Sequence, residues 1–243
     1  GMKIKQMIDE KIITKEQAKI GYVAAFPLPE VISGYTSFYL GVRSVVPEAV
    51  MTVKYTNTWG SYALEKKYAT QLINEGCVII SQHSDTTGPA VACEEVKGKH
   101  VVYHVGYNQS MADVAPTTYL TGCRINWEPY ISAAVEAVLS EKDIESSLDA
   151  NINGNDAGAG FDQSWVQMLE VNELIAAPGT KEKVEKLIGS FKKKEINVFQ
   201  GDYTGVDPDN KEDVISLKEG YQENEKSSAP TFHYVLRDVI HVE

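Results

Sequence analysis

A group of polar side chains that could do chemistry stands directly after the largely apolar run Cys77–Ser81. The segment Gln82-His83-Ser84-Asp85 contains the His, Ser and Asp of a hydrolase triad. Triad members, however, converge from separate elements and are not sequence neighbours, and the sequence has no GxSxG nucleophile elbow. We therefore expect these side chains to contact a ligand or to cap a loop, and not to catalyse a reaction.

Other motifs match phosphate and metal sites poorly. The glycines of Gly154–Gly160 are spaced like a phosphate cradle, but the Lys-Ser/Thr pair of a Walker loop is missing. Asp207-Pro208-Asp209-Asn210 resembles part of a calcium loop, but its proline and the lack of further spaced ligands count against it. No two histidines lie four residues apart on a predicted helix; the five are His83, His100, His104, His233 and His241. The sequence thus predicts no metal site and no cofactor, and a histidine inside a strand, such as His104, is expected in the core.

Strands that alternate with helices must position these side chains. We predict strands over Lys19–Ala25, Val50–Thr56, Cys77–Ser81, Val101–Gly106 and Tyr119–Ile125, and helices over Glu30–Val46, Ser61–Glu75, Ala90–Val96 and Glu128–Leu139. This alternation indicates right-handed βαβ units, and an unbroken apolar strand indicates a sheet that is covered on both faces. The predicted fold class is therefore α/β with a parallel, doubly wound sheet.

The two ends of the chain carry weaker patterns. Residues 3–18 predict a short helix and a turn, with Thr14 as N-cap and Gln17 three residues later. The last hundred residues predict, in chain order, a turn-rich loop, a strand, a helix and a mostly irregular segment, over Asn151–Gly160, Val166–Val171, Lys181–Lys194 and 201–230. Thr231–Val242 is predicted to end the chain as a helix or a strand, with a helix favoured.

Ligands of open parallel sheets bind beyond the carboxyl ends of the strands, so the segments after the predicted strands are the candidate site. The candidate ligand-binding residues there are Phe26, Trp59, Gln82, His83, Asp85, Tyr107, Asn108, Asn126 and Trp127. Aromatic faces with a few directional hydrogen-bonding groups suit a flat, neutral ring with polar edges, such as a nucleobase. The alternative is that these rings only pack against neighbouring helices.

Composition excludes several classes of protein. The chain has 243 residues, of which 43% are hydrophobic, so it can bury a core and is not disordered. Its net charge of -11 disfavours binding to nucleic acids and to anionic lipid. No apolar run approaches the ~18 residues of a membrane span. The three cysteines, Cys77, Cys93 and Cys123, lie in apolar segments and are predicted to be buried thiols.

Five segments in and between the candidate loops resemble the basic membrane protein family of substrate-binding lipoproteins, which serves ABC importers and includes purine nucleoside receptors. The matching segments are Ile20–Ile32, Leu40–Val45, Thr56–Trp59, Gln82–Asp85 and Asn126–Tyr130. They span residues 19–140, and the C-terminal hundred residues match only loosely.

The resemblance implies a type I periplasmic-binding-protein-like protein that holds a purine nucleoside or nucleobase between two lobes. This chain would supply one flavodoxin-like lobe, with most of the N-terminal lobe missing from it. Residues 1–18 would be a helix or hinge segment, and residues 19–141 the ligand-binding lobe. Residues 142–243 would complete the lobe and cross back toward the missing one.

The resemblance also implies an ABC permease as partner and no enzyme activity. The whole protein would be extracytoplasmic, as a lipoprotein anchored at the cell surface by a lipobox that lies upstream of residue 1. An isolated lobe is expected to self-associate, because it exposes a cleft face that its partner lobe covers.

The resemblance assigns ligand contacts to two residues. Phe26 falls where the family stacks a ring on the base, and Asn108 falls where nucleoside binders have an aspartate that grips the ribose. An asparagine still hydrogen-bonds a hydroxyl but loses the charge-assisted part, about 1 kcal/mol. Ile125 stands near a lysine position of the nucleoside binders. A free base or another flat heterocycle therefore remains an alternative to a nucleoside.

Two other functional classes remain open at this point. One is an α/β enzyme that acts on nucleosides or nucleobases, with His83 or Asp85 as acid or base. The other is a regulatory or protein-docking module. The lack of a convincing nucleophile or acid/base pair favours binding over both.

Overall fold

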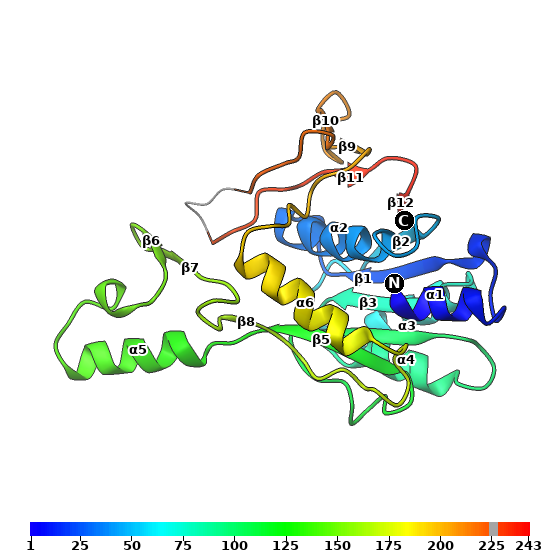
Figure 1. The fold of residues 1–243 in the computed structure, drawn as a ribbon, viewed down its shortest axis with the longest axis horizontal. Helices are drawn as coiled ribbons and strands as arrows, with labels where there is room; N and C mark the ends of the chain where they lie inside the picture. The colour runs from blue at the N-terminus through cyan, green and yellow to red at the C-terminus, as the bar shows by residue number, and fades with distance from the viewer. Residues whose placement is uncertain (224–227) are drawn as a thin grey trace.

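The fold is built on a mainly parallel sheet with helices on both faces (Figure 1). The computed structural model describes residues 1–223 and 228–243. The main sheet has the strand order β12-β2-β1-β3-β4-β5-β8, formed by β1 (Lys19–Ala24), β2 (Val50–Tyr55), β3 (Ile79–His83), β4 (Tyr103–Tyr107), β5 (Tyr119–Ile125), β8 (Val166–Met168) and β12 (Ile240–Val242). Within the described chain, β8 alone runs antiparallel in this sheet. The central order β2-β1-β3-β4-β5 is flavodoxin-like, which confirms the predicted doubly wound α/β fold.

Helices cover the sheet on two sides. They are α1 (Met2–Asp9), α2 (Pro29–Arg43), α3 (Tyr62–Asn74) and α4 (Gly88–Glu95). Two further helices, α5 (Glu128–Leu139) and α6 (Thr180–Lys192), bury at most one residue each. Ile20 and Tyr22 of β1 pack in a cluster with side chains of α1 and α2, whereas Val23 packs with α3 and α4. Because β1 is buried on both faces, its apolar run does not alternate with polar residues.

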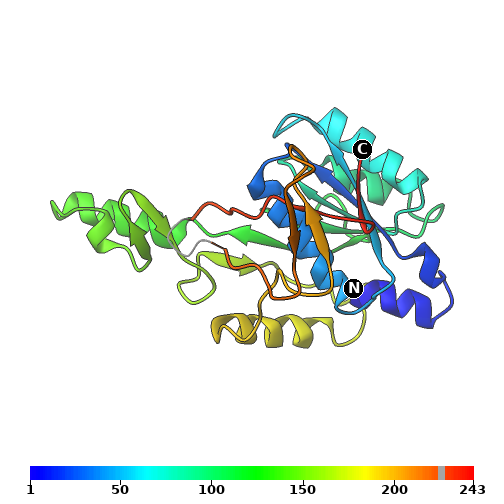
Figure 2. The ribbon, with the colours of Figure 1, turned by 90° about the horizontal axis from the view of Figure 1, so that it is seen from above.

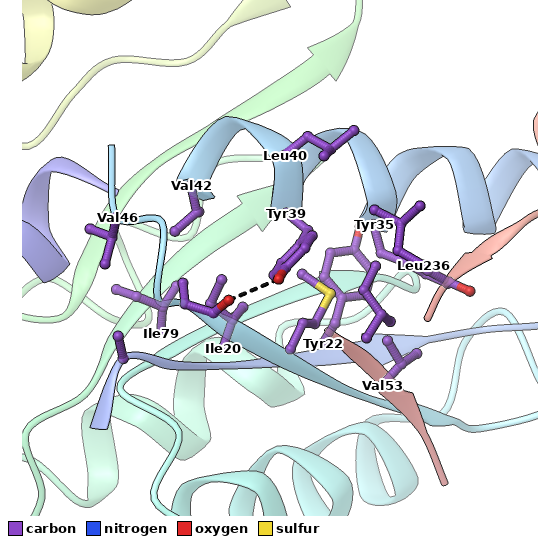
Figure 3. Packing of buried hydrophobic residues seen from close by; sticks show 14 of the residues in the cluster. Ile20, Tyr22, Tyr35, Tyr39, Leu40, Val42, Val46, Val53, Ile79 and Leu236 are labelled. Atoms are coloured by element: carbon purple, nitrogen blue, oxygen red, sulfur yellow. Dashed lines mark hydrogen bonds between the residues drawn. The ribbon is translucent and has the colours of Figure 1, made fainter. Parts of the chain in front are cut away.

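The larger core lies between α2 and strands β1 to β3 (Figure 3). Tyr39 is fully buried there, and its hydroxyl donates a hydrogen bond to the carbonyl oxygen of Ala49 at 2.8 Å. On the other face, a Cβ at Gly21 would lie 2.8 Å from the Cβ of Leu72, so the glycine lets α3 approach the sheet closely. Close packing on both faces fixes the strands whose ends carry the candidate site.

Two strands end later than predicted. β3 covers Ile79–His83 instead of Cys77–Ser81, because its parallel pairing with β1 continues to the pair Ala24 and His83. β4 covers Tyr103–Tyr107 instead of Val101–Gly106. The candidate side chains of Gln82, His83 and Tyr107 therefore stand on the strands themselves, where pairing holds the backbone more firmly than in a loop.

The predicted loop over residues 201–230, of which residues 224–227 lie outside the described residues, and the helix favoured over Thr231–Val242 are both wrong in part. A small antiparallel sheet of order β10-β9-β11 lies over α2, formed by β9 (Thr204–Val206), β10 (Val214–Ser216) and β11 (Val235–Leu236). The chain end then forms β12 at the edge of the main sheet. Asp238 has a φ of 66°, which turns the chain between β11 and β12 and breaks any helix. Valine and isoleucine at Val235, Ile240 and Val242 favour strands.

A segment that we call the arm, residues 127–158, projects from the sheet (Figures 1 and 2). It contains α5, which begins and ends as predicted, a short 3-10 helix (Glu145–Ser147), and the strands β6 (Asn151–Asn153) and β7 (Asp156–Gly158). The turn-rich loop predicted over Asn151–Gly160 is thus a β-hairpin, in which Gly154 has a φ of 63°. Glycine adopts this left-handed conformation readily, as a tight hairpin turn requires.

The N-terminal segment packs on the main core. Ile4 and Met7 of α1 are buried in the larger cluster. After α1, the backbone N–H of Thr14 donates to the side-chain oxygen of Gln17 at 2.8 Å, as predicted for the turn there. No helix within residues 1–223 and 228–243 has the length and apolar character needed to cross a membrane.

The cysteine prediction is only partly correct. All three thiols are free, and Cys77 and Cys93 are buried. Burial raises the pKa of Cys77 to about 12, which keeps this thiol protonated and unreactive at neutral pH. Cys123, however, is exposed, because it lies toward the end of β5 where the sheet is no longer covered.

Candidate functional site

Four rings line the carboxyl ends of β1 to β4. Phe26 and Trp59 have ring centroids 5.4 Å apart, Trp59 and His83 are 6.4 Å apart, and His83 and Tyr107 are 4.2 Å apart. Each residue comes from a different strand or from the loop that follows it. We call this set, Phe26, Trp59, His83 and Tyr107, the ring shelf. Trp59 is 37% exposed, so part of the shelf faces solvent.

The ring shelf lies at the point where the sheet changes its winding direction. β1 and β3 are neighbours, but the connection after β1 leads to β2 on one side and the connection after β3 leads to β4 on the other side. Such a reversal leaves a crevice outside the strand ends, where open α/β sheets bind their ligands. Phe26 follows β1, and His83 ends β3, so these two rings flank that crevice.

His83 is the most constrained member of the shelf. It is 5% exposed, and neither ring nitrogen has a hydrogen-bond partner among the described residues. Burial lowers its pKa to about 4, so the imidazole is neutral at pH 7. The Glu30 carboxylate lies 3.8 Å from Nε2, but it would form an ion pair only with a protonated ring. Both ring nitrogens are themselves covered, so this neutral, unpartnered imidazole can serve a ligand as donor or acceptor only after the neighbouring side chains shift.

Gly34 of α2 makes room for His83. A Cβ at this position would lie 2.6 Å from Nδ1 of the imidazole, closer than real contacts allow. The ring is therefore held between α2 and the Tyr107 ring. Gly34 is not among the predicted site residues, although it stands next to the matching segment Ile20–Ile32.

Hydrogen bonds to backbone carbonyl oxygens connect the loops that follow β2, β3 and β4. The N–H of Asp85 donates to the carbonyl oxygen of Trp59 at 2.8 Å, and Nε2 of Gln109 donates to the carbonyl oxygen of Asp85 at 3.2 Å. The Asp85 carboxylate itself is exposed and has no hydrogen-bond partner among the described residues. It stands free at the rim of the shelf, and burial, followed by the charge of Glu65, raises its pKa.

Gln82 is the residue of β3 before His83, and its side chain reaches into the loop that follows the strand. It is buried, and its Nε2 donates to the carbonyl oxygens of Ser84 and Thr86, both at 2.8 Å. This side chain holds the loop in shape and does not point toward the ring shelf, because neighbouring strand residues face opposite sides of a sheet. Its predicted contact with a ligand is thus not favoured by the geometry.

Glu65 of α3 is a residue that sequence reasoning missed. Its fully buried carboxylate accepts hydrogen bonds from the Ser61 N–H at 2.9 Å, the Ser84 hydroxyl at 2.8 Å and the Thr86 N–H at 3.1 Å. It therefore joins the start of α3 to the loop after β3. The available signal was the pair Ser61 and Glu65, an N-cap followed by a carboxylate in the first turn.

Asn108 connects β4 to β5 below the shelf. It has a φ of 63°, and its Oδ1 accepts a hydrogen bond from the N–H of Ile125 at 3.1 Å. The side chain is exposed, so Nδ2 remains available to a ligand at the rim. Tyr107 precedes it directly and belongs to the shelf.

Asn126 and Trp127 lie in a different ring group. Trp127 contacts Tyr130 with ring centroids 6.3 Å apart, and Tyr130 contacts Trp165 at 5.9 Å. Asn126 is buried, and its Nδ2 donates to the carbonyl oxygen of Ser164 at 2.9 Å. No ring contact within the described residues joins this group to the shelf. The predicted site residues thus separate into a shelf on β1 to β4 and a second group at the base of the arm.

Two hollows of the surface lie away from the ring shelf. One of about 280 Å³ lies at the opposite edge of the sheet, lined by residues that precede β4 and β5, and another of about 270 Å³ lies between α5 and the 3-10 helix of the arm. Neither includes a residue of the ring shelf.

Residues 13–199 match the family model described as ABC transporter substrate-binding protein, PnrA-like. The chain belongs to this family. Two curated relatives support the assignment. TsgA13 of Haloferax volcanii, named as an ABC transporter glucose-binding protein, is 33% identical over 70% of this chain and 41% of its own length. A purine-binding protein of Brucella abortus is 30% identical over 74% of this chain and 47% of its own length. The chain therefore spans less than half the length of these relatives.

Solved structures agree on the fold. An ABC transporter solute-binding protein of Conexibacter woesei superposes with a TM-score of 0.56 and 17% identity, covering 74% of this chain and 56% of that one. A comparable protein of Aeropyrum pernix gives a TM-score of 0.53 and 15% identity, covering 80% of this chain and 54% of that one. A transcriptional activator of the comK gene of Bacillus halodurans gives 0.56 and 16%, covering 80% and 62%. The fold is therefore that of periplasmic-binding proteins. The Bacillus halodurans protein, which is named as a transcriptional activator, has a similar fold.

Membership in a family of substrate-binding proteins makes the ring shelf a candidate surface for binding a small molecule. Proteins of this family hold a small molecule for an ABC transporter and do not transform it, and they act outside the cytoplasm. Ser84, the hydroxyl between His83 and Asp85 in the sequence, donates to the Glu65 carboxylate at 2.8 Å and not to His83, so these three residues do not form a triad.

Proposed function

We propose that this chain is the ligand-binding lobe of an ABC importer receptor, and that it holds a purine base or nucleoside against the ring shelf. The observation that carries the proposal is the neutral, unpartnered His83 within four rings at the winding reversal of the sheet. A purine has two flat faces and an edge of nitrogen donors and acceptors. Rings can stack on its faces while a neutral imidazole bonds its edge.

The rim of the shelf offers groups for a sugar. The Asp85 carboxylate is free, and Nδ2 of Asn108 is exposed, so either could hydrogen-bond a ribose hydroxyl. With an asparagine in place of a carboxylate at residue 108, one charge-assisted bond is lost, which costs about 1 kcal/mol. We therefore expect a nucleoside to bind this chain little better than the free base does.

We further propose that a second lobe covers the shelf when ligand binds. The relatives are more than twice as long as the matched region, and the arm carries an apolar face that nothing in the described residues covers. In this proposal residues 19–141 form the lobe, and residues 142–243 complete it and cross toward the second one, with residues 1–18 near the hinge. Closure would bury the ligand and present the closed surface to a permease. The whole protein would be a lipoprotein at the cell surface.

Calorimetric titration tests the ligand class. We expect adenine, guanine, adenosine or guanosine to bind with at best micromolar affinity, because one wall of the site is present, and glucose to bind at least tenfold more weakly. Phe26→Ala should weaken purine binding at least tenfold, whereas Trp127→Ala, in the other ring group, should leave it within twofold. Tighter binding of glucose than of any purine would contradict the proposed ligand and favour the sugar named for TsgA13.

Chromatography of the nucleosides after incubation tests the alternative of an enzyme. We expect adenosine and guanosine to be recovered unchanged. Conversion that is abolished by His83→Ala would overturn the proposal of a receptor. If purines and glucose both fail to bind the full-length protein as well, the docking module becomes the better explanation.

A further inference from the structure

Three metal-ligating side chains meet on the small sheet, far along the chain from the ring shelf. Asp207 follows β9, Asp213 precedes β10, and His233 precedes β11 (Figure 1). One ligand atom of each lies within 4.8 Å of the others. Motif spacing does not predict this cluster, because twenty residues separate His233 from Asp213 and no metal motif has that spacing.

The imidazole of His233 is held with one nitrogen free. Its Nδ1 lies 2.8 Å from the carbonyl oxygen of Thr231, which can only accept, so Nδ1 carries the proton. Nε2 therefore presents its lone pair, and it lies 3.8 Å from Oδ2 of Asp207. A backbone carbonyl that fixes the tautomer in this way is the usual outer partner of a metal-binding histidine.

Both carboxylates are also oriented by outer partners. Oδ1 of Asp207 accepts a hydrogen bond from the N–H of Asp209 at 2.9 Å, which leaves Oδ2 toward the imidazole. The hydroxyl of Tyr234 donates to Asp213, with its oxygen 3.2 Å from Oδ1. The Tyr234 ring stacks on His233 with centroids 4.3 Å apart, so the same residue supports two of the three ligands.

The cluster places like charges together without a permanent cation. The backbone N–H of Asp207 bonds the carbonyl oxygen of Asp213, so the two residues stand opposite each other where the β9–β10 hairpin begins. Like charges directly across two strands destabilise a sheet. Among the described residues, neither Asp207 nor Asp213 forms an ion pair with a lysine or arginine, and His233 would pair with Asp207 only as a protonated ring. A bound cation would remove this repulsion.

We propose that Asp207, Asp213 and His233 bind a divalent transition-metal ion, with Zn²⁺ as the best match. One imidazole and two carboxylates suit Zn²⁺ with a water in the fourth position. Ca²⁺ is a poorer match, because it takes six to eight oxygen ligands and an imidazole supplies none. The ion would join β11 to the β9–β10 hairpin. Since β11 leads directly into β12, it would also fix the last strand of the main sheet.

Titration of metal-stripped protein with ZnCl2 and CaCl2 tests this site. We expect one Zn²⁺ per chain with an affinity at least tenfold higher than that for Ca²⁺, and a rise in melting temperature on adding Zn²⁺. Asp213→Asn and His233→Gln should each weaken Zn²⁺ binding at least tenfold and abolish that rise. His241→Gln is the matched control, because His241 is an exposed histidine on β12 outside the cluster.

The outcomes separate a site from adventitious binding. Equal Zn²⁺ affinity in the wild type, Asp213→Asn and His233→Gln proteins would overturn the proposal, as would no heat of binding at millimolar ZnCl2. Circular dichroism of each metal-free variant shows whether it remains folded. If Asp213→Asn does not fold, His233→Gln alone decides the question, because its amide can keep the contact to Thr231 while removing the imidazole.

Discussion

Helices α2 and α5 show how differently two apolar helices can be used in one molecule. α2 buries eight of its residues, among them Tyr35, Tyr39 and Val42, against the main sheet. α5 has more apolar residues than polar ones but buries only Ala137. Val138 is 65% exposed and Leu139 is 81% exposed, although both would suit a core.

The difference shows that burial, and not apolar content, determines how much a helix contributes to the stability of the fold. Apolar area stabilises a fold only when it is removed from water, at about 25 cal/mol per Å². The body, residues 19–126, satisfies this condition on both faces of its sheet. The arm does not, and a contiguous exposed apolar face of this kind marks a contact surface.

The largest expected effect contrasts one core residue with one arm residue. Ile80→Ala in the fully buried β3 should lower the free energy of unfolding by about 2–5 kcal/mol, because it leaves a cavity between the sheet and α3. Leu139→Ala should change it by less than about 0.5 kcal/mol, because this side chain is already in water. Urea unfolding of both variants measures the contrast. Similar losses would show that the arm is covered in solution.

The second expected effect is a loss of stability in acid. His83 and His104 are both buried, and burial lowers their pKa values to about 4 and about 3, against a usual value of 6.5. At a pH between the usual value of 6.5 and these lowered values, the unfolded chain binds more protons than the folded one. The free energy of unfolding therefore falls as pH falls from about 6.5 toward 4. The shift of His83 corresponds to about 3 kcal/mol.

Urea unfolding at pH 7 and pH 4.5 checks this pH dependence. His83→Gln removes one of the two titrating rings and should reduce the loss between these pH values by about half, leaving the share of His104. An unchanged loss in the variant would mean that His83 is solvated or paired in solution.

A third, smaller effect compares two glycines of α2. Gly34→Ala would place a Cβ 2.6 Å from the His83 ring, so it should destabilise the protein by about 1–3 kcal/mol and weaken purine binding. Gly41→Ala is the matched control, because nothing lies within 4 Å of its Cβ. Alanine is the better helix former, so this variant should gain about 0.5–1 kcal/mol. Thermal unfolding of the pair should thus give opposite signs, and equal signs would contradict the tight fit of His83.

Regular periodicity made much of the body predictable from sequence. The βαβ alternation placed β1 to β5 and α2 to α5 within a few residues, because each strand runs for five to seven residues and the central strands β1 and β3 are buried on both faces. The C-terminal region was not predictable in the same way. Its strands have two or three residues, and β12 gains its partner, β2, from a position nearly 190 residues earlier, which no local pattern records.

The candidate site was also predictable from sequence only in part. Phe26, Trp59, His83 and Tyr107 could be placed together because parallel strand ends meet at one edge of a sheet. That rule could not show that Gln82 turns into its own loop, or that Trp127 joins Tyr130 and Trp165 instead of the shelf. Strand register and side-chain hydrogen bonds decide these placements, and both depend on contacts distant in sequence.

The smallest effect on stability should accompany the largest effect on assembly. The apolar face of the arm predicts that this chain self-associates at high concentration, as dimers or larger species in size-exclusion chromatography with light scattering. Val135→Lys combined with Leu139→Lys should shift the protein toward monomer while changing the free energy of unfolding by less than about 0.5 kcal/mol. Both side chains are more than half exposed, so the lysines meet water and not the core.

Ile12→Lys is the control, since Ile12 is a half-exposed apolar residue outside the arm and should leave the assembly unchanged. A wild-type chain that stays monomeric at high concentration would show that the arm folds back onto the body, and the contrast between α2 and α5 would then be lost.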